Sequence, residues 1–363
     1  MNNLLKYATL ALALAGTAAG TSAQTQVNIT TTSDNDTVLY TVTPMSALVG
    51  NTRGLKVDTL LTKGGKATIN LPEDGARIGV AGPALLGNRI GAILVLPGEK
   101  INVAVTPSSF DVTGSELVES IMKFEAERNA GQARLMALQQ QGVSRDSLMV
   151  EYNRFMTAAD KYLPDNLDNA FGVYLLANAS MAAREEFVDE IAEEVQEGAL
   201  KPLYLNSLYA VDNYRTSQAA QESVKEGTPA PEFSLPDMEG KSVTLSSFRG
   251  KWVILDFWGA WCKWCIKGMP QLREFYAAHK KDIEVIGIDC QDTREQWLAA
   301  VKEHGMDWVQ LVNDPAPGEK SVSSMYGVRG YPTKLLIDPK GIISIICVGE
   351  DPSFFDQVLS KMK

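Results

Sequence analysis

The stretch "DFWGAWCKWCIKGMP", residues 256–270, places two cysteines three residues apart at the end of an apolar run. The chain has four cysteines in all, so half of them fall within this one segment. Such a pair is compatible with half of a metal site, with covalent haem attachment, or with a redox couple. The choice among these three kinds of site decides the fold and the chemistry predicted for this region.

The metal and haem interpretations lack residues that they need. A structural zinc site takes four ligands, usually from two spaced pairs, and the sequence has no second Cys-x-x-Cys. The two histidines, His279 and His304, lie far apart in charged, helix-like stretches. Haem attachment requires a histidine directly after the second cysteine, where the chain has Ile266. We therefore expect no metal and no cofactor, and a redox couple of Cys262 and Cys265.

The residues around the couple favour thiol chemistry. A strand ending in "DFWGAW" would place Cys262 at the start of a helix, where free backbone N–H groups and the helix dipole stabilise a thiolate. Lys263 adds a positive charge, and Cys265 lies one turn further on, close enough to attack a mixed disulfide at Cys262. Pro270 falls inside the predicted helix and is expected to kink it.

The surrounding sequence alternates between strand and helix patterns. Apolar runs predict strands at 252–258, 284–290, 333–338 and 342–349, and amphipathic patterns predict helices at about 262–279, 293–305 and 353–363. This alternation, with a terminal hairpin, predicts an α/β layer fold. The preceding "KEGTPAPEFSLPDMEGK" is rich in Pro and Gly and is interpreted as a linker and domain entry.

Residues 226–363 resemble the TlpA/ResA-like branch of the thioredoxin family. The resemblance rests on "GTPAPEFSLPDMEGKSVTLSSFRGKWVILDFWGAWCKWC" and "YGVRGYPTKLLIDPKG", and covers a little over a third of the chain. It implies a thioredoxin fold and an exported thiol–disulfide oxidoreductase that acts on protein disulfides or dithiols and exchanges electrons with a further, unidentified protein. Reduction of partner disulfides, including apocytochrome cysteines in cytochrome c maturation, is the family's common use; isomerisation and disulfide formation are the alternatives.

The resemblance also implies roles for individual residues. Cys262 would attack the partner and Cys265 would resolve the mixed disulfide. Asp256 matches a buried aspartate that relays a proton to or from the inner thiol, and burial without a cationic partner is expected to raise its pKa. Pro332 matches the cis-proline beside the active disulfide, and the backbone of Tyr331 would pair with an extended partner segment. The predicted partner-contacting residues are Trp258, Trp261, Lys263, Trp264, Tyr331 and Pro332.

Two positions depart from the family pattern. Gly268, six residues after Cys262, stands where some ResA-like proteins carry a glutamate that tunes the cysteine pKa, so that tuning is expected to be absent, with Asp256 as its substitute. Trp264 stands in place of the familiar proline of the motif. Its ring is either a packing element or a partly exposed group that shapes the choice of substrate.

Two other functions compete with the oxidoreductase. A thiol peroxidase of the AhpC/TSA type carries a threonine three residues before its reactive cysteine, and Gly259 occupies that place here. A binding protein could use the thioredoxin domain as a scaffold, but the intact cysteine couple and Pro332 argue against an inert domain. Cys290 and Cys347 are isolated beside β-branched runs and are interpreted as small buried hydrophobic residues, unless strand pairing brings them together.

The first residues predict export. Lys6 followed by "ATLALALAGTAAG", which is too short to span a bilayer, and "TSA" before Gln24 are typical of a signal peptide at 1–23 that is cleaved near Ala23. The mature chain is then expected in a bacterial periplasm, without a stable membrane span. A net charge of −10 argues against nucleic acid as a partner.

The remaining sequence predicts two regions before the thioredoxin-like domain at 223–363. Residues 24–113 alternate like strands and predict a β-sandwich or partly open barrel, with hairpins in "VDTLLTKGGKATINL" and "AILVLPGEKINVAV". This β region also resembles a module that precedes thioredoxin domains in other exported bacterial proteins. Residues 114–222 predict helices, the first capped by Ser115 and with Leu117, Ile121 and Phe124 on one face.

Overall fold

The structure is a computed structural model that describes residues 24–48, 57–81, 93–106, 110–315 and 318–363. The predicted signal peptide at 1–23 lies outside these residues. The described residues fall into two compact units, residues 24–45 with 57–125 and residues 46–48 with 126–363. No helix among the described residues is long and apolar enough to cross a membrane.

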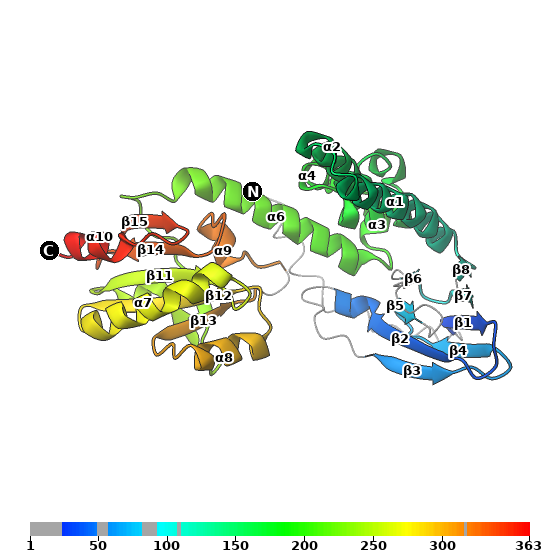
Figure 1. Ribbon diagram of the computed structural model, residues 1–363, viewed down its shortest axis with the longest axis horizontal. Coiled ribbons are helices and arrows are strands. Elements are labelled where there is room, and N and C mark those ends of the chain that lie inside the picture. Colours follow the sequence, from blue (N-terminus) through cyan, green and yellow to red (C-terminus); the bar gives the residue numbers. More distant parts are fainter. Residues whose placement is uncertain (1–23, 49–56, 82–92, 107–109, 316–317) are drawn as a thin grey trace. The chain divides into compact units, whose positions relative to one another are not determined.

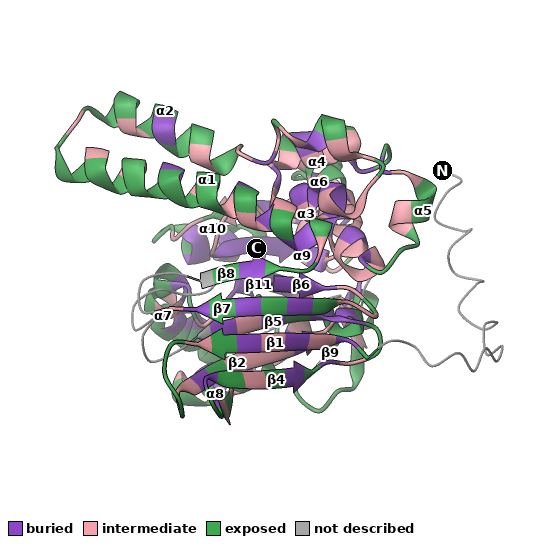
Figure 2. Ribbon diagram, turned by 90° about the vertical axis from the view of Figure 1, so that its right-hand side faces the viewer, coloured by how far each residue is buried: buried purple, intermediate pink, exposed green. Residues whose placement is uncertain are grey.

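The first unit contains two four-stranded sheets, ordered β4-β1-β7-β8 and β3-β2-β5-β6. Their strands are β1 (Gln26–Thr31), β2 (Thr37–Pro44), β3 (Asp58–Leu61), β4 (Lys66–Asn70), β5 (Ala76–Ala81), β6 (Ile93–Val95), β7 (Lys100–Val105) and β8 (Phe110–Thr113). Exposed and buried residues alternate along β7 (Figure 2), and the buried side chains of both sheets form one core. The predicted N-terminal β region is confirmed, and its two packed sheets make it a sandwich.

The two predicted hairpins are wrong, although their turns are present. Gly64 and Gly65 have positive φ angles of 60° and 69°, and Lys63 and Lys66 exchange both backbone hydrogen bonds across them. The flanking strands nevertheless separate, because β3 pairs with β2 and β4 pairs with β1. The Pro-Gly turn likewise connects β6 of one sheet to β7 of the other. The local sequence determines where the chain reverses direction. Which strand each segment pairs with depends instead on the sheet in which its apolar face becomes buried.

The helical region begins at α1 (Glu116–Gln140), where the Val118 N–H donates to Ser115 Oγ at 3.4 Å. Leu117, Ile121 and Phe124 are all buried, as the helical spacing predicts. The helices that follow are α2 (Arg145–Met156), α3 (Ala170–Asn178), α4 (Met181–Phe187), α5 (Glu193–Gln196) and α6 (Lys201–Ser223). Short 3₁₀ turns occur at Met45–Leu48, Leu163–Asn166 and Leu245–Phe248. The predicted helical middle region is confirmed.

The C-terminal part contains a five-stranded sheet in the order β13-β12-β11-β14-β15, with β11 (Trp252–Trp258) at its centre. Its other elements are α7 (Lys263–His279), β12 (Ile283–Cys290), α8 (Arg294–Glu303), β13 (Val309–Asn313), α9 (Val322–Met325), β14 (Thr333–Ile337), β15 (Ile343–Val348) and α10 (Phe354–Lys361). β11, β12 and β13 are parallel, and β14 and β15 are antiparallel to their neighbours. α7 crosses in front of this sheet (Figure 1). The order of the strands, their directions and the covering helix together confirm the predicted thioredoxin fold.

Both faces of the sheet are covered, so β11 is buried along nearly its whole length. Ile254 and Trp258 of β11 pack with apolar residues of α7, α8 and α10, while Leu255 and Phe257 pack on the opposite face with α9. α6 also contacts α9, and the Ser321 N–H donates to Asn213 Oδ1 of α6 at 2.9 Å. Because successive strand residues point to opposite faces, Asp256 lies on the α7 side.

Two features of this domain were not predicted. The edge strand β13 is short, and its buried Gln310 interrupts the apolar pattern. The segment interpreted as a linker contains β9 (Ser234–Pro236), which pairs with β10 (Ser242–Thr244) directly after the segment. Pro and Gly in that segment mark its turns and do not prevent it from pairing.

Candidate active site

The two neighbouring cysteines form a disulfide at the start of α7. The S–S distance is 2.07 Å, and Cys262 is the N-cap residue, whose sulfur accepts a hydrogen bond from the Cys265 N–H at 3.2 Å. Both residues are buried, with Cys262 the less deeply buried of the two. Reduction would therefore place a thiol at a helix N-terminus, where backbone N–H groups and the helix dipole favour its ionised form.

Three contacts hold the loop that presents Cys262. The Ala260 N–H donates to the Asp292 carboxylate at 2.6 Å, and Trp261 Nε1–H donates to the Cys290 carbonyl oxygen at 3.0 Å. The Trp261 and Tyr331 rings pack edge to face, with their centroids 5.2 Å apart. Sequence reasoning missed Asp292. Its signal was its position just after β12, because residues following neighbouring parallel strands gather at the same edge of a sheet.

The loop before β14 contains the predicted cis peptide bond, between Tyr331 and Pro332. The Pro332 carbonyl oxygen accepts a hydrogen bond from the Gly349 N–H at 2.8 Å, and Thr333 Oγ1–H donates to the Gly330 carbonyl oxygen at 2.7 Å. Through its contact with Trp261, Tyr331 connects this loop to the segment that carries Cys262.

Aromatic side chains are exposed on both sides of Cys262. Trp261 is 48% exposed and Trp264 is 61% exposed. Lys263 is exposed between them, and Lys267 Nζ lies 5.0 Å from the centre of the Trp264 ring. The packing alternative for Trp264 is therefore wrong. Large exposed rings beside a reactive pair form an apolar surface that a partner can cover.

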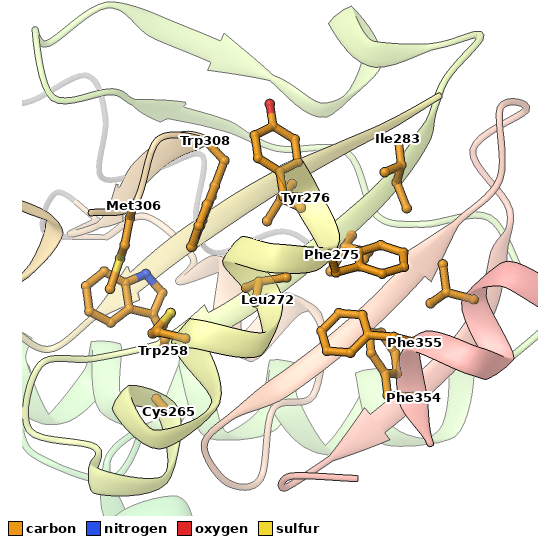
Figure 3. Packing of buried hydrophobic residues seen from close by; sticks show 14 of the residues in the cluster. Trp258, Cys265, Leu272, Phe275, Tyr276, Ile283, Met306, Trp308, Phe354 and Phe355 are labelled. Carbon is orange, nitrogen blue, oxygen red and sulfur yellow. The ribbon is translucent and has the colours of Figure 1, made fainter. Parts of the chain in front are cut away.

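Trp258 does not belong to that surface, and its predicted role in partner contact is wrong. Its side chain is completely buried in the core cluster between β11 and α7, which also contains Cys265, Leu272 and Met306 (Figure 3). Trp258 ends β11 on the inner face of the sheet, so strand geometry directs its ring inward. It supports the inner side of the cysteine pair.

Asp256 is buried on the same face of β11. Its Oδ1 has no hydrogen-bond partner among the described residues. Burial raises the pKa of Asp256 from the ordinary 3.8 to about 6, while nearby Lys334 lowers it and Glu350 raises it. The predicted direction of the pKa change is confirmed, but the expected lack of a cationic partner is wrong. Lys334 of β14 lies directly opposite Asp256 of β11 in the sheet, and its Nζ lies 4.0 Å from Asp256 Oδ1.

Lys334 and Glu350 complete a buried charged cluster that sequence reasoning did not identify. Lys334 Nζ–H donates to Glu350 Oε1 at 2.7 Å. Burial opposes the lysine's charge, but Asp256 and Glu350 outweigh burial and raise the pKa of Lys334. The signal was a lone lysine within the otherwise apolar strand "TKLLI", because a buried lysine requires an acidic partner.

The other two cysteines are free thiols. Cys290 is buried, and burial raises its pKa to about 12; burial likewise raises the pKa of the half-buried Cys347. Both are therefore protonated and weakly nucleophilic at neutral pH. Among the described residues, no group of three or more His, Cys, Asp or Glu side chains is arranged to hold a metal ion.

Comparison with known proteins places these residues within one family of sequences. Residues 227–346 match the model of the AhpC/TSA family. The thiol–disulfide oxidoreductase ResA of Bacillus thuringiensis is 34% identical over 149 residues, which cover 41% of this chain and 84% of ResA. ResA of Bacillus subtilis is 31% identical over 137 residues, which cover 38% of this chain and 74% of ResA.

Solved structures match the same part of the chain. The thioredoxin domain of a thiol–disulfide oxidoreductase from Bacteroides vulgatus is 30% identical, and the match covers 39% of this chain and all of that domain, with a TM-score of 0.35.

Proposed function

Because this chain belongs to the ResA/TlpA-like thioredoxin family and is a thiol–disulfide oxidoreductase, we propose that Cys262 and Cys265 are the couple with which it reduces or isomerises disulfides of partner proteins. The observation that carries this proposal is their disulfide at the N-terminus of α7, beside exposed aromatic rings. The helix terminus stabilises the thiolate that attacks.

The reaction proceeds by two exchanges. In the reduced protein the Cys262 thiolate attacks one sulfur of a partner disulfide, which forms a mixed disulfide and releases the other partner sulfur as a thiolate. The Cys265 thiol loses its proton and attacks the sulfur of Cys262. The bond to the partner then breaks, and the Cys262–Cys265 disulfide forms. Two electrons pass to the partner, and a separate electron-donor protein restores the dithiol.

Asp256 accepts the proton of Cys265 in the second exchange and later returns it. Its burial on the α7 side of β11, and a pKa near 6, support this role because a general base works best near the operating pH. The partner segment lies against Trp261, Lys263 and Trp264, and pairs with the backbone of Tyr331 beside Pro332. The exposure of Trp261, Lys263 and Trp264 supports this binding surface.

A thiol peroxidase would need a threonine at the place of Gly259. A Cβ added there would lie 2.5 Å from Trp261 Nε1 and 3.0 Å from the Cys290 carbonyl oxygen, so a larger side chain does not fit beside the Trp261 ring. This crowding argues against the peroxidase alternative.

The oxidoreductase is proposed to act in the bacterial periplasm, where the signal-like sequence at 1–23 would direct it. Apocytochrome c cysteines are one proposed substrate, by analogy with the family's common use.

Insulin reduction by the full mature chain tests the proposed function. We expect the wild type to reduce insulin with dithiothreitol as donor, and Cys262→Ser to reduce it no faster than dithiothreitol alone. In periplasmic extracts, Cys265→Ala should trap partners as mixed disulfides at Cys262. A wild-type chain that fails to accelerate insulin reduction would refute the oxidoreductase and favour a scaffold.

A further inference from the structure

Glu350 follows β15, yet its carboxylate lies against α7. A Cβ added to Gly268 would lie 2.6 Å from Glu350 Cδ and 2.7 Å from its Oε2. The carboxylate therefore occupies space that any side chain at residue 268 would need. Gly268 comes three residues after Cys265 in α7, so Glu350 rests about one helical turn beyond the inner cysteine.

The backbone before Glu350 is anchored to the active-site loop. The Gly349 N–H donates to the Pro332 carbonyl oxygen at 2.8 Å, which ties the end of β15 to the cis-proline. Glu350 is thus held between two segments of the candidate site, the proline loop and α7.

Glu350 also determines where the positive charge of Lys334 lies. The lysine Nζ is 2.7 Å from Glu350 Oε1 but 4.0 Å from Asp256 Oδ1. The Asp256 and Lys334 side chains are only 2% and 5% exposed, while that of Glu350 is 23% exposed. Little water is present to screen the two buried groups from each other, so a small movement of the ammonium group has a large electrostatic effect on Asp256.

The other titratable groups near Asp256 include two thiols, the cysteine couple and the buried carboxyl of Asp289, which lies opposite Trp258 on the neighbouring strand β12. Cys290 of β12 interacts with Asp256, and Cys347 of β15 interacts with Lys334, and both thiols are neutral at pH 7. The couple itself lies on α7 and does not titrate while it is a disulfide. Among the charged groups, Lys334 and Glu350 are the ones that shift the pKa of the Asp256 carboxyl in this state.

Resting on the function proposed above, we propose that Glu350 is a positioning residue for thiol–disulfide exchange: by binding Lys334 it keeps the ammonium group from pairing directly with Asp256, and so leaves Asp256 free to exchange a proton near neutral pH. Without the Glu350 carboxylate, Lys334 would turn to the unpartnered Asp256 Oδ1. A direct charge-assisted hydrogen bond would then hold Asp256 ionised.

The test is a titration of the Asp256 carboxyl in the full mature chain, in its disulfide form. Carbon-13 label in the aspartate carboxyl groups is followed by NMR from pH 4 to pH 9, and the Asp256 signal is identified by its loss in Asp256→Asn. In Glu350→Gln we expect the midpoint to fall by about one pH unit or more, the usual effect of a close opposite charge. Glu274→Gln, which removes an exposed carboxylate of α7, is the matched charge control and should leave the midpoint unchanged.

A second variant separates position from charge. Gly268→Ala keeps every charged group but displaces the Glu350 carboxylate, so the midpoint should move in the same direction as in Glu350→Gln. A midpoint that stays level or rises in Glu350→Gln overturns the proposal; one that stays level in Gly268→Ala overturns the role of this contact. The titration does not depend on turnover, so its result remains valid even if the wild-type chain fails to reduce insulin. Failure to reduce insulin would refute the proposed function and not the role of Glu350.

If the proposal holds, the pH profile of mixed-disulfide resolution in Glu350→Gln should shift to lower pH together with the Asp256 midpoint. A merely structural role for Glu350 would lower the rate without moving that profile.

Discussion

Asp256 imposes a pH-dependent cost on the fold that replacement by asparagine should remove. The carboxyl is buried, and its pKa is raised from the ordinary 3.8 to about 6, chiefly by burial. At about 1.4 kcal/mol per pH unit, this shift means that ionised Asp256 destabilises the folded state by about 3 kcal/mol relative to its protonated form.

The folded and unfolded states lose the Asp256 proton at different pH values, and this difference decides whether the protein gains or loses stability as pH rises. As pH rises, the unfolded chain releases the Asp256 proton near pH 4, while the folded chain keeps it until about pH 6. The wild type therefore loses stability through this window relative to Asp256→Asn, which has no such proton. Any effect of the asparagine on packing changes the free energy of unfolding by the same amount at every pH. It therefore does not contribute to the change in the difference between the two proteins from one pH to another.

The assay is urea unfolding of the disulfide form at pH 4, 5 and 7.5, followed by tryptophan fluorescence. All six tryptophans lie between residues 252 and 308, so the signal reports the C-terminal domain even if the rest of the chain unfolds separately. We expect the free energy of unfolding of Asp256→Asn, relative to wild type, to rise by about 2 kcal/mol from pH 4 to pH 7.5, because the carboxyl of the unfolded chain is already partly ionised at pH 4. A difference that is level across pH, or falls as pH rises, would refute the reasoning.

Three further outcomes follow from the site. In the reduced protein at neutral pH, iodoacetamide should modify Cys262 before Cys265; the reverse order, read by mass spectrometry, would reverse their roles. Trp258→Ala should lower the free energy of unfolding by about 3–5 kcal/mol, whereas Trp264→Ala should change it by under about 1 kcal/mol and instead raise KM for a protein disulfide; equal losses in stability would contradict the assigned burial. Asp292→Ala should cost about 2 kcal/mol through loss of its hydrogen bond to the Ala260 N–H, and an unchanged urea midpoint would show that this bond does not hold the loop.

The strand, turn and helix around the cysteine couple could be predicted because short-range rules govern them. A continuous apolar strand, a tight turn and a thiol at the N-cap are all determined within about twenty residues of sequence. Pairing between distant strands is not encoded in this way. The turn at Gly64 and Gly65 was predicted correctly, yet β3 and β4 enter different sheets because each pairs with a strand far from it in sequence.

The charged cluster was missed for the same reason. Lys334 becomes intelligible only when β14 is known to lie beside β11, which places the lysine opposite Asp256. The absence of an acidic group was expected at position 268, because the sequence places a glycine there and gives no sign that another residue's carboxylate would fill the space. The structure brings the Glu350 carboxylate against that position from a segment more than eighty residues away.

The contact between α6 and α9 matters for anyone who wishes to produce the C-terminal domain as a fragment. A fragment that starts at residue 223 follows the predicted boundary but removes α6, and with it the Asn213 side chain that accepts the Ser321 N–H. Gly327 also packs closely against Gln221 of the same helix. Such a fragment would expose the surface of α9 that α6 covers, which favours self-association in concentrated samples. Expression should therefore start before Lys201, so that the helix is purified with the domain that it covers.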